Sequence, residues 1–354
     1  MPALDPTSDS ADLTRAICDV PSVSGDEQAL ADLIEAAART APHLEVLRLG
    51  DAVVARTHLS RPTRVVIAGH IDTVPINGNV PTRLDGDEIV GRGTVDMKAG
   101  VAVQLKLAVE LAEPAVDVTW IWYDHEEVSD DLNGLNRLLR TRPDLLEADF
   151  AILGEPTAAG IEGGCNGNLR AEIRTFGRRA HSARGWVGVN AIHLAAPILD
   201  RLAAYEPRTV EVDGLEYREG LNAVGITGGV AGNVIPDECM VHVNHRFAPS
   251  RSAEEAVRHV EEVFEGFDVR IVDLAPGARP GLDQPIARAF VEAVGAEPRP
   301  KFGWTDVARF SALGVPAVNY GPGDPLLAHA DDERVAIEQI HAGEAGLRAW
   351  LTGA

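Results

Sequence analysis

Histidine and carboxylate side chains follow the ends of two strand-like segments in the first half of the chain. One apolar run ends at His70, with Asp72 two positions later, and a second run, 117–123, leads into Glu126 and Glu127. In open α/β sheets, ligands bind beyond the carboxyl ends of the strands. We therefore expect these side chains to share one site.

Three more candidates occupy similar positions. Asp96 precedes a helical segment, Glu155 follows a short apolar run, and His329 lies in an acidic loop near the C-terminus. Each has a simpler interpretation, since Asp96 could cap its helix and the other two could be solvated loop residues. Their shared position at strand ends and in loops nevertheless favours a common site.

The types of these side chains predict a divalent metal centre. Two histidines and several carboxylates, with no thiolate among them, suit two ions that share a bridging carboxylate, and zinc is the expected metal. Asp72 is placed to accept a proton from the second ring nitrogen of His70, as metal-bound histidines usually require. A neighbouring glutamate that binds no metal would be the general base of metal-assisted hydrolysis.

The elements that must position these residues form two patterns. A length of 354 residues predicts about two domains. The first half alternates buried strand-like runs with helical segments, which is typical of an α/β domain with a mostly parallel sheet. The expected helices are 26–39 and 97–111, and the expected strands are 64–69, 117–123 and 151–153.

The pattern changes after about residue 167, where apolar and polar residues begin to alternate as in antiparallel strands. This part predicts a compact α+β insert, followed by a linker at 275–281. Residues 287 to the end are expected to complete the first domain. The expected elements of the insert are strand 169–176, helix 190–202, strands 223–230 and 238–247, helix 253–264 and strand 269–272.

Composition excludes several classes of function. Acidic residues outnumber Lys and Arg by 54 to 32, and the net charge of −22 would repel a phosphate backbone, so a nucleic-acid partner is not expected. The sequence has no apolar run long enough for a membrane span and no signal for secretion. Cys18, Cys165 and Cys239 are far apart, which argues against a disulfide framework and favours the cytoplasm.

Five motifs resemble, in order, those of the two-zinc amidohydrolase family. They are GHIDTVP (69–75), GRGTVDMKAG (91–100), HEEV (125–128), GEPT (154–157) and HADDE (329–333). The resemblance covers nearly the whole chain. It implies a zinc-peptidase-like catalytic domain, 1–167 and 278–354, with a mostly parallel sheet. It also implies an inserted ferredoxin-like lid domain, 168–277, through which the protein forms a homodimer.

The resemblance further implies a role for each candidate. Two divalent ions per subunit, zinc or cobalt, would share the carboxylate of Asp96. The remaining ligands would be His70 and Glu155 for one ion and Glu127 and His329 for the other. Glu126 would be the general base and Asp72 the partner of His70. The segment RAHS (179–182) is similar to a lid motif, which implies that His181 reaches the partner's site and stabilises the oxyanion.

Within the family, several segments are most similar to the desuccinylases. The implied substrate contacts are Asn233, Arg246, Thr305 and Arg309. The chain departs from that pattern at 161–167, where many desuccinylases carry basic residues and this sequence has none. Arg184 is an alternative group for the succinyl carboxylate, because a guanidinium fork matches a carboxylate.

The expected reaction is therefore hydrolysis of N-succinyl-LL-2,6-diaminopimelate to succinate and LL-2,6-diaminopimelate, a step of lysine and cell-wall precursor synthesis. Deacetylation of N-acetylornithine is the main alternative, because it needs the same metal chemistry with a neutral acyl group. Hydrolysis of a dipeptide or of another N-acyl amino acid is a third possibility. A metal-free binding protein with the same fold is an alternative of a different class, which the complete set of ligands disfavours.

Overall fold

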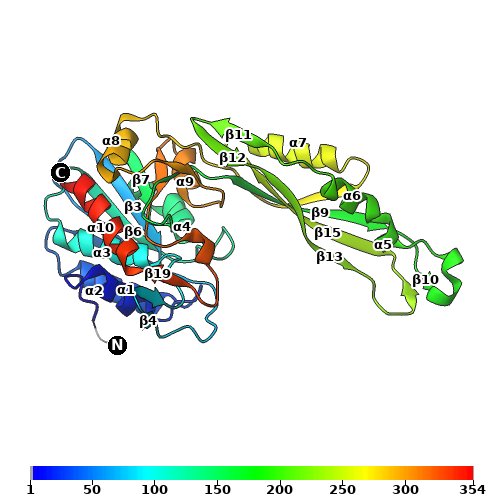
Figure 1. Ribbon diagram of the computed structural model, residues 1–354, viewed down its shortest axis with the longest axis horizontal. Helices are drawn as coiled ribbons and strands as arrows, with labels where there is room; N and C mark the ends of the chain where they lie inside the picture. Colours follow the sequence, from blue (N-terminus) through cyan, green and yellow to red (C-terminus); the bar gives the residue numbers. More distant parts are fainter. Residues whose placement is uncertain (1–2, 354) are drawn as a thin grey trace. The chain divides into compact units, whose positions relative to one another are not determined.

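The computed structural model describes residues 3–353, which divide into two compact units (Figure 1). The first unit comprises Met1–Gly163, Pro280–Arg299 and Arg309–Ala354, and the second comprises Gly164–Arg279 and Pro300–Ala308. Segment 300–308, which we expected in the catalytic domain, thus groups with the second unit. One reason is a backbone hydrogen bond of 3.2 Å from Asn166 N to Lys301 O.

The first unit is built on an eight-stranded sheet whose four central strands are parallel. Their order is β6 (Asp117–Tyr123), β3 (Arg64–His70), β7 (Phe150–Leu153) and β18 (Ala317–Asn319). Almost every residue of these strands is buried, as their continuous apolar sequences predict. The outer strands are β1 (Glu45–Leu49) and β2 (Ala52–Arg56) on one side, and β8 (Glu162–Gly163) and β17 (Arg299–Pro300) on the other.

Helices cover this sheet. Helix α3 (Lys98–Glu110) packs on β3 and β6, and most of its residues are buried because three further helices pack against it: α1 (Ser10–Cys18), α2 (Gln28–Ala38) and α10 (Ile337–Thr352). The remaining helices of this part of the chain are α4 (Gly134–Thr141), α8 (Pro285–Val294) and α9 (Val307–Ala312). Large aromatic side chains such as Trp120, Trp122 and Phe150 are buried in the core between the layers.

A small three-stranded sheet joins the end of the chain to its first third. Strand β19 (Arg334–Ala336) pairs with β5 (Glu88–Val90), which pairs with β4 (Arg83–Asp85). Because β5 and β19 are hydrogen-bonded, the loop that follows β5 and the loop that precedes β19 are held side by side. These two loops carry Asp96 and His329.

The second unit has a ferredoxin-like core, as expected. Its strands β9 (Gly167–Phe176), β13 (Gly220–Gly228), β15 (Glu238–Phe247) and β16 (Asp268–Ala275) form an antiparallel sheet in the order β13-β15-β9-β16. Helices α5 (Ala191–Leu194), α6 (Ala196–Ala203) and α7 (Ala253–Val263) pack on this sheet. Alternate residues of β15 are buried, which is the pattern of a sheet with one covered face.

Two details of the second unit differ from expectation. The single helix expected over 190–202 is two short helices, α5 and α6, because Pro197 in the first turn of α6 has no N–H to continue the helical hydrogen bonds. The hairpin of β11 (Thr209–Val212) and β12 (Leu215–Arg218) was not predicted. Its sequence mixes charged and apolar residues without a long alternating run. A further short pair joins β10 (Ala180–His181) to β14 (Val234–Ile235).

Candidate metal centre

The carboxyl ends of three adjacent parallel strands present the candidate ligands. Strand β3 ends at His70, and its neighbour β6 ends at Tyr123, directly opposite His70 in the register. Residues 124–127 continue from β6, so Glu126 and Glu127 emerge beside His70. On the other side of β3, strand β7 leads into Glu155, which is buried. The parallel pairing thus places these side chains along one edge of the sheet.

Four of the expected ligands lie close together. Among residues 3–353, one ligand atom from each of His70, Asp96 and Glu127 can be chosen so that all three lie within 4.8 Å of one another. The Nε2 atom of His329 lies 2.9 Å from Glu127 Oε1 and 3.3 Å from Asp96 Oδ2. The other oxygen of Asp96, Oδ1, lies 3.0 Å from His70 Nε2. One carboxylate therefore presents its two oxygens to two different histidines.

This donor set fits a pair of divalent metal ions. Imidazole nitrogen and carboxylate oxygen are ligands that zinc accepts, and a carboxylate with one oxygen toward each histidine has the disposition of a bridging ligand. Glu155, the fifth expected ligand, lies at the same sheet edge, and its role stays a prediction.

Electrostatics also favour a cation at this position. Hydrogen bonds to Asp96 and Glu127 raise the pKa of His329 to about 10 although burial opposes its charged form. For His70, burial likewise favours the neutral ring, but its bonds to Asp72 and Asp96 outweigh burial and raise its pKa well above the usual value. The surrounding carboxylates thus attract positive charge, which a bound metal ion would supply in place of these protons.

Asp72 has a larger role than the sequence predicts. The expected contact to His70 is present, with His70 Nδ1 3.4 Å from Asp72 Oδ1 and 3.1 Å from the main-chain oxygen of Asp72. The same carboxylate accepts hydrogen bonds from the amides of Glu126 and Glu127, each at 3.0 Å, and from Ser24 Oγ at 2.7 Å. Asp72 therefore connects the His70 ring to the backbone of the paired glutamates.

These contacts keep Asp72 charged. The side chain is completely buried, and burial alone would raise its pKa. The His70 ring, Ser24 and the Glu126 amide outweigh burial and lower the pKa to about 2. A permanently charged carboxylate accepts several hydrogen bonds at once, as this position requires.

Glu333 is a residue of the site region that sequence reasoning missed. It is buried, and Oε1 accepts hydrogen bonds from the amides of Val95 at 2.9 Å and Asp96 at 3.2 Å. Its Oε2 lies 2.7 Å from Arg92 Nη1. Glu333 thus ties the loop of His329 to the loop of Asp96. The signal available in the sequence was its place in the HADDE motif, but the two other acidic residues of that motif gave no reason to single it out.

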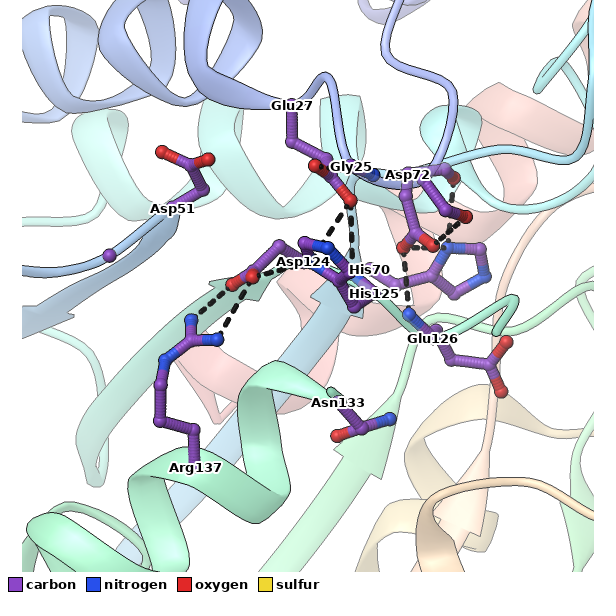
Figure 2. Close-up of polar contacts among 12 residues, drawn as sticks. Gly25, Glu27, Asp51, His70, Asp72, Asp124, His125, Glu126, Asn133 and Arg137 are labelled. Carbon is purple, nitrogen blue, oxygen red and sulfur yellow. Dashed lines mark hydrogen bonds and ion pairs between the residues drawn. The ribbon is translucent and has the colours of Figure 1, made fainter. Parts of the chain in front are cut away.

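Glu126 and the expected substrate contacts are placed as follows. Glu126 is half-buried, its amide faces Asp72, and its carboxylate points away from Asp72 (Figure 2). Arg309 belongs to the first unit and lies 2.6 Å from Asp130. The other expected contacts belong to the second unit, and their roles stay predictions: His181, Arg184, Asn233, Arg246 and Thr305.

A parallel sheet that presents histidine and carboxylate ligands for divalent metal ions, next to an additional glutamate, defines a metal-dependent hydrolase. Residues 66–352 match the profile of peptidase family M20/M25/M40. The chain belongs to this family, and it is an enzyme of the metal-dependent amidohydrolase class.

Two curated relatives are similar over their full lengths. A Mycobacterium tuberculosis protein described as a succinyl-diaminopimelate desuccinylase is 55% identical over 353 residues, which is 99% of this chain and 100% of the relative. The succinyl-diaminopimelate desuccinylase of Corynebacterium glutamicum is 48% identical over 99% of this chain and 98% of its own length.

Solved structures share the fold at lower identity. A tripeptidase from Staphylococcus aureus has a TM-score of 0.79 and 20% identity, with 99% of both chains covered. A dinuclear metal-binding peptidase of the M20 family from Bacillus subtilis has a TM-score of 0.72 and 18% identity, with 97% of this chain and 96% of its own covered. None of the helices described between residues 3 and 353 is long and apolar enough to cross a membrane.

Proposed function

We propose that this enzyme hydrolyses N-succinyl-LL-2,6-diaminopimelate to succinate and LL-2,6-diaminopimelate, in the synthesis of lysine and of cell-wall precursors. The full-length identity of 55% and 48% to two proteins described as succinyl-diaminopimelate desuccinylases carries this assignment. The metal-binding donor set at the sheet edge supports the reaction class. The cytoplasm, where we place the reaction, is a reducing compartment, which agrees with three free cysteines.

Two divalent ions, with zinc as the expected metal, would be held by five residues. His70 and Glu155 would bind one ion, Glu127 and His329 the other, and Asp96 both. The strongest support is the disposition of Asp96, whose two oxygens lie 3.0 Å from His70 Nε2 and 3.3 Å from His329 Nε2. When bound, such a metal pair lowers the pKa of water and polarises a carbonyl group.

Glu126 would act as the general base and acid. In this role it takes a proton from the attacking water and then delivers that proton to the leaving amine, so that the amide is cleaved without releasing an unstable anion. Two features support the role: Glu126 directly precedes an expected metal ligand, and Asp72 holds the amides of both glutamates at 3.0 Å.

The second unit would supply substrate contacts and the dimer interface. Arginine is suited to bind the succinyl carboxylate, and Arg184 and Arg246 are the candidates in this unit, with Asn233 and Thr305 as polar contacts. Arg309 is a further candidate, from the first unit. A homodimer through the second unit is supported by exposed apolar side chains there, including Trp186 at 79% and Val224 at 67% exposure. In such a dimer His181 would stabilise the oxyanion in the partner's site.

The substrate assignment is tested by comparing two acyl substrates with zinc-loaded protein. We expect kcat/KM for N-succinyl-LL-2,6-diaminopimelate to exceed that for N-acetylornithine by at least about 30-fold, since an arginine left unpaired in a buried site costs about 2 kcal/mol or more. A kcat/KM for N-acetylornithine equal to or above that for the succinyl substrate would contradict this assignment and favour a deacetylase with the same metal centre.

A further inference from the structure

His125, which directly precedes Glu126, has an unusual backbone conformation. Its φ angle is +59°, in the left-handed region that non-glycine residues seldom adopt. The residue lies just after the buried strand β6, where the chain must turn so that Glu126 and Glu127 reach the sheet edge. The sequence at this turn contains no glycine, so other contacts must hold the conformation.

One set of contacts comes from Glu27 at the start of α2. Its side chain is completely buried, and its Oε1 accepts a hydrogen bond of 3.2 Å from the amide of His125. The same oxygen lies 3.3 Å from His125 Nδ1, and Oε2 accepts a bond of 2.9 Å from the Gly25 amide (Figure 2). Glu27 thus contacts both the backbone and the ring of His125.

A second set comes from Asp124 and helix α4. Asp124 Oδ2 lies 2.8 Å from His125 Nδ1. This nitrogen thus lies near two carboxylate oxygens, one from Asp124 and one from Glu27. Because ionised carboxylates only accept hydrogen bonds, Nδ1 carries the hydrogen. Arg137 donates to the Asp124 carboxylate with both of its terminal nitrogens, and the Gly134 amide donates to the Asp124 main-chain oxygen at 2.8 Å. Two buried, anchored carboxylates therefore contact the same nitrogen of the His125 ring.

We propose that Glu27, Asp124 and His125 form a clamp that fixes the turn before Glu126, and that Glu27 and His125 are positioning residues for the general base. The clamp contacts the amide and the ring of His125, and Asp72 contacts the amides of Glu126 and Glu127. This inference rests on the proposed role of Glu126, and its test separates the two.

Three substitutions of His125 distinguish the ring contacts from the backbone angle. Asparagine tolerates a positive φ and keeps a side-chain donor, glycine tolerates the angle without a donor, and alanine has neither property. We expect kcat to stay within about threefold of wild type for His125→Asn, and to fall about 10-fold for His125→Gly and about 100-fold for His125→Ala, because a misplacement near 1 Å has an effect of that order. KM and metal content should remain unchanged.

Glu27 provides an independent pair of variants. Glu27→Gln keeps one carbonyl oxygen that can accept from the His125 amide, whereas Glu27→Ala removes both acceptors. The clamp predicts a smaller loss of kcat for Glu27→Gln than for Glu27→Ala. His58 gives matched controls, because its side chain is exposed and pairs with Glu45 at the surface. His58→Asn and His58→Gly should leave kcat as in wild type.

Hydrogen exchange of the peptide covering 122–130 tests the clamp without using activity. The Glu126 and Glu127 amides are hydrogen-bonded to a buried carboxylate, so they should exchange slowly in wild type and at least about 10-fold faster in His125→Gly and Glu27→Ala. Exchange elsewhere in the first unit and the thermal midpoint should stay close to wild type, which separates a local loosening from general destabilisation.

Different results would overturn the clamp, the positioning role or the proposed function. Unchanged exchange in His125→Gly and Glu27→Ala, or kcat of His125→Gly equal to or above that of His125→Asn, overturns the clamp. Faster exchange with unchanged kcat shows that the turn is loosened without harm to the base, and it overturns the positioning role. If wild-type protein fails to hydrolyse the succinyl substrate, the proposed function fails, while the exchange results still decide whether the clamp exists.

Discussion

At the scale of single residues, Asp96 is the side chain to which the proposed metal centre assigns both ions. Its oxygens lie near two histidines that are far apart in the sequence, and burial of Asp96 is outweighed by these rings, which keep its pKa below the usual value. We expect Asp96→Ala to lose activity and at least one equivalent of bound metal, since this single carboxylate lies near both histidines.

Metal analysis of purified Asp96→Ala by atomic emission, after dialysis against metal-free buffer, measures this effect. Asp85→Ala is a suitable control, because Asp85 is an exposed acid that pairs with Arg83 at the surface. Two tightly bound equivalents in Asp96→Ala would contradict the bridging role.

For Glu126 we predict the complementary behaviour: the variant Glu126→Gln should keep its bound metal ions and lose turnover. The amide in Glu126→Gln has nearly the same shape as the carboxylate but cannot accept the proton. Loss of a general base typically lowers kcat by about 10²–10⁴-fold, and we expect an effect of this size with both metal equivalents retained. Turnover within threefold of wild type would place the base at another residue.

At the scale of elements, the paired loops after β5 and before β19 depend on a buried charge pair. Glu333 and Arg92 are both almost inaccessible, with side-chain exposures of 1% and 4%. Glu333→Gln keeps an oxygen for the Val95 and Asp96 amides but leaves Arg92 without its counter-charge. We expect it to lower the free energy of unfolding by about 3–5 kcal/mol, the usual cost of breaking a buried pair.

Urea unfolding of metal-free protein measures this loss, and the double variant Glu333→Gln with Arg92→Met should lose less than the sum of the two single variants. The exposed pair of Arg83 and Asp85 is the matched control, for which Asp85→Asn should cost no more than about 1 kcal/mol. Additive losses at Glu333 and Arg92 would show that the two side chains are not coupled.

Elements with a clear hydrophobic pattern, continuous or alternating, could be predicted from the sequence, whereas contacts fixed by long-range packing could not. Strand 117–123 has the expected bounds because buried parallel strands are continuously apolar. The edge at which His70, Glu126 and Glu127 meet follows from the parallel arrangement. The contacts of Glu27 and Glu333 could not be foreseen, because an acidic residue at a helix start or in a loop gives no sign that the folded chain will bury it against distant amides.

At the scale of the whole molecule, the homodimer is the largest element of the proposal still to be tested. If His181 acts in the partner's site, mixing Glu126→Gln protein with His181→Ala protein should restore activity. Random exchange makes about half of the dimers mixed, and each mixed dimer has one intact site. We therefore expect roughly a quarter of wild-type activity, by the statistics of a two-fold symmetric dimer.

Activity of the mixture is measured after subunit exchange has been demonstrated by native mass spectrometry. Each variant mixed with itself under the same conditions is the control and should stay inactive. No recovery after complete exchange would restrict His181 to its own subunit, and it would leave the metal ligands unaffected.

The distance along the chain between Glu127 and His329 has a consequence for the newly synthesised protein. These residues are 202 positions apart, yet their side chains lie 2.9 Å from each other. At a synthesis rate of 5–20 residues per second, about 10–40 s separate their appearance on the ribosome. The main segment of the second unit, Gly164–Arg279, whose ends meet in the bridge between Cys165 and Ala278, can fold within that interval. The proposed second metal position would therefore lack its histidine until residue 329 has been synthesised, so that binding of the second ion would wait for the acidic loop that carries His329.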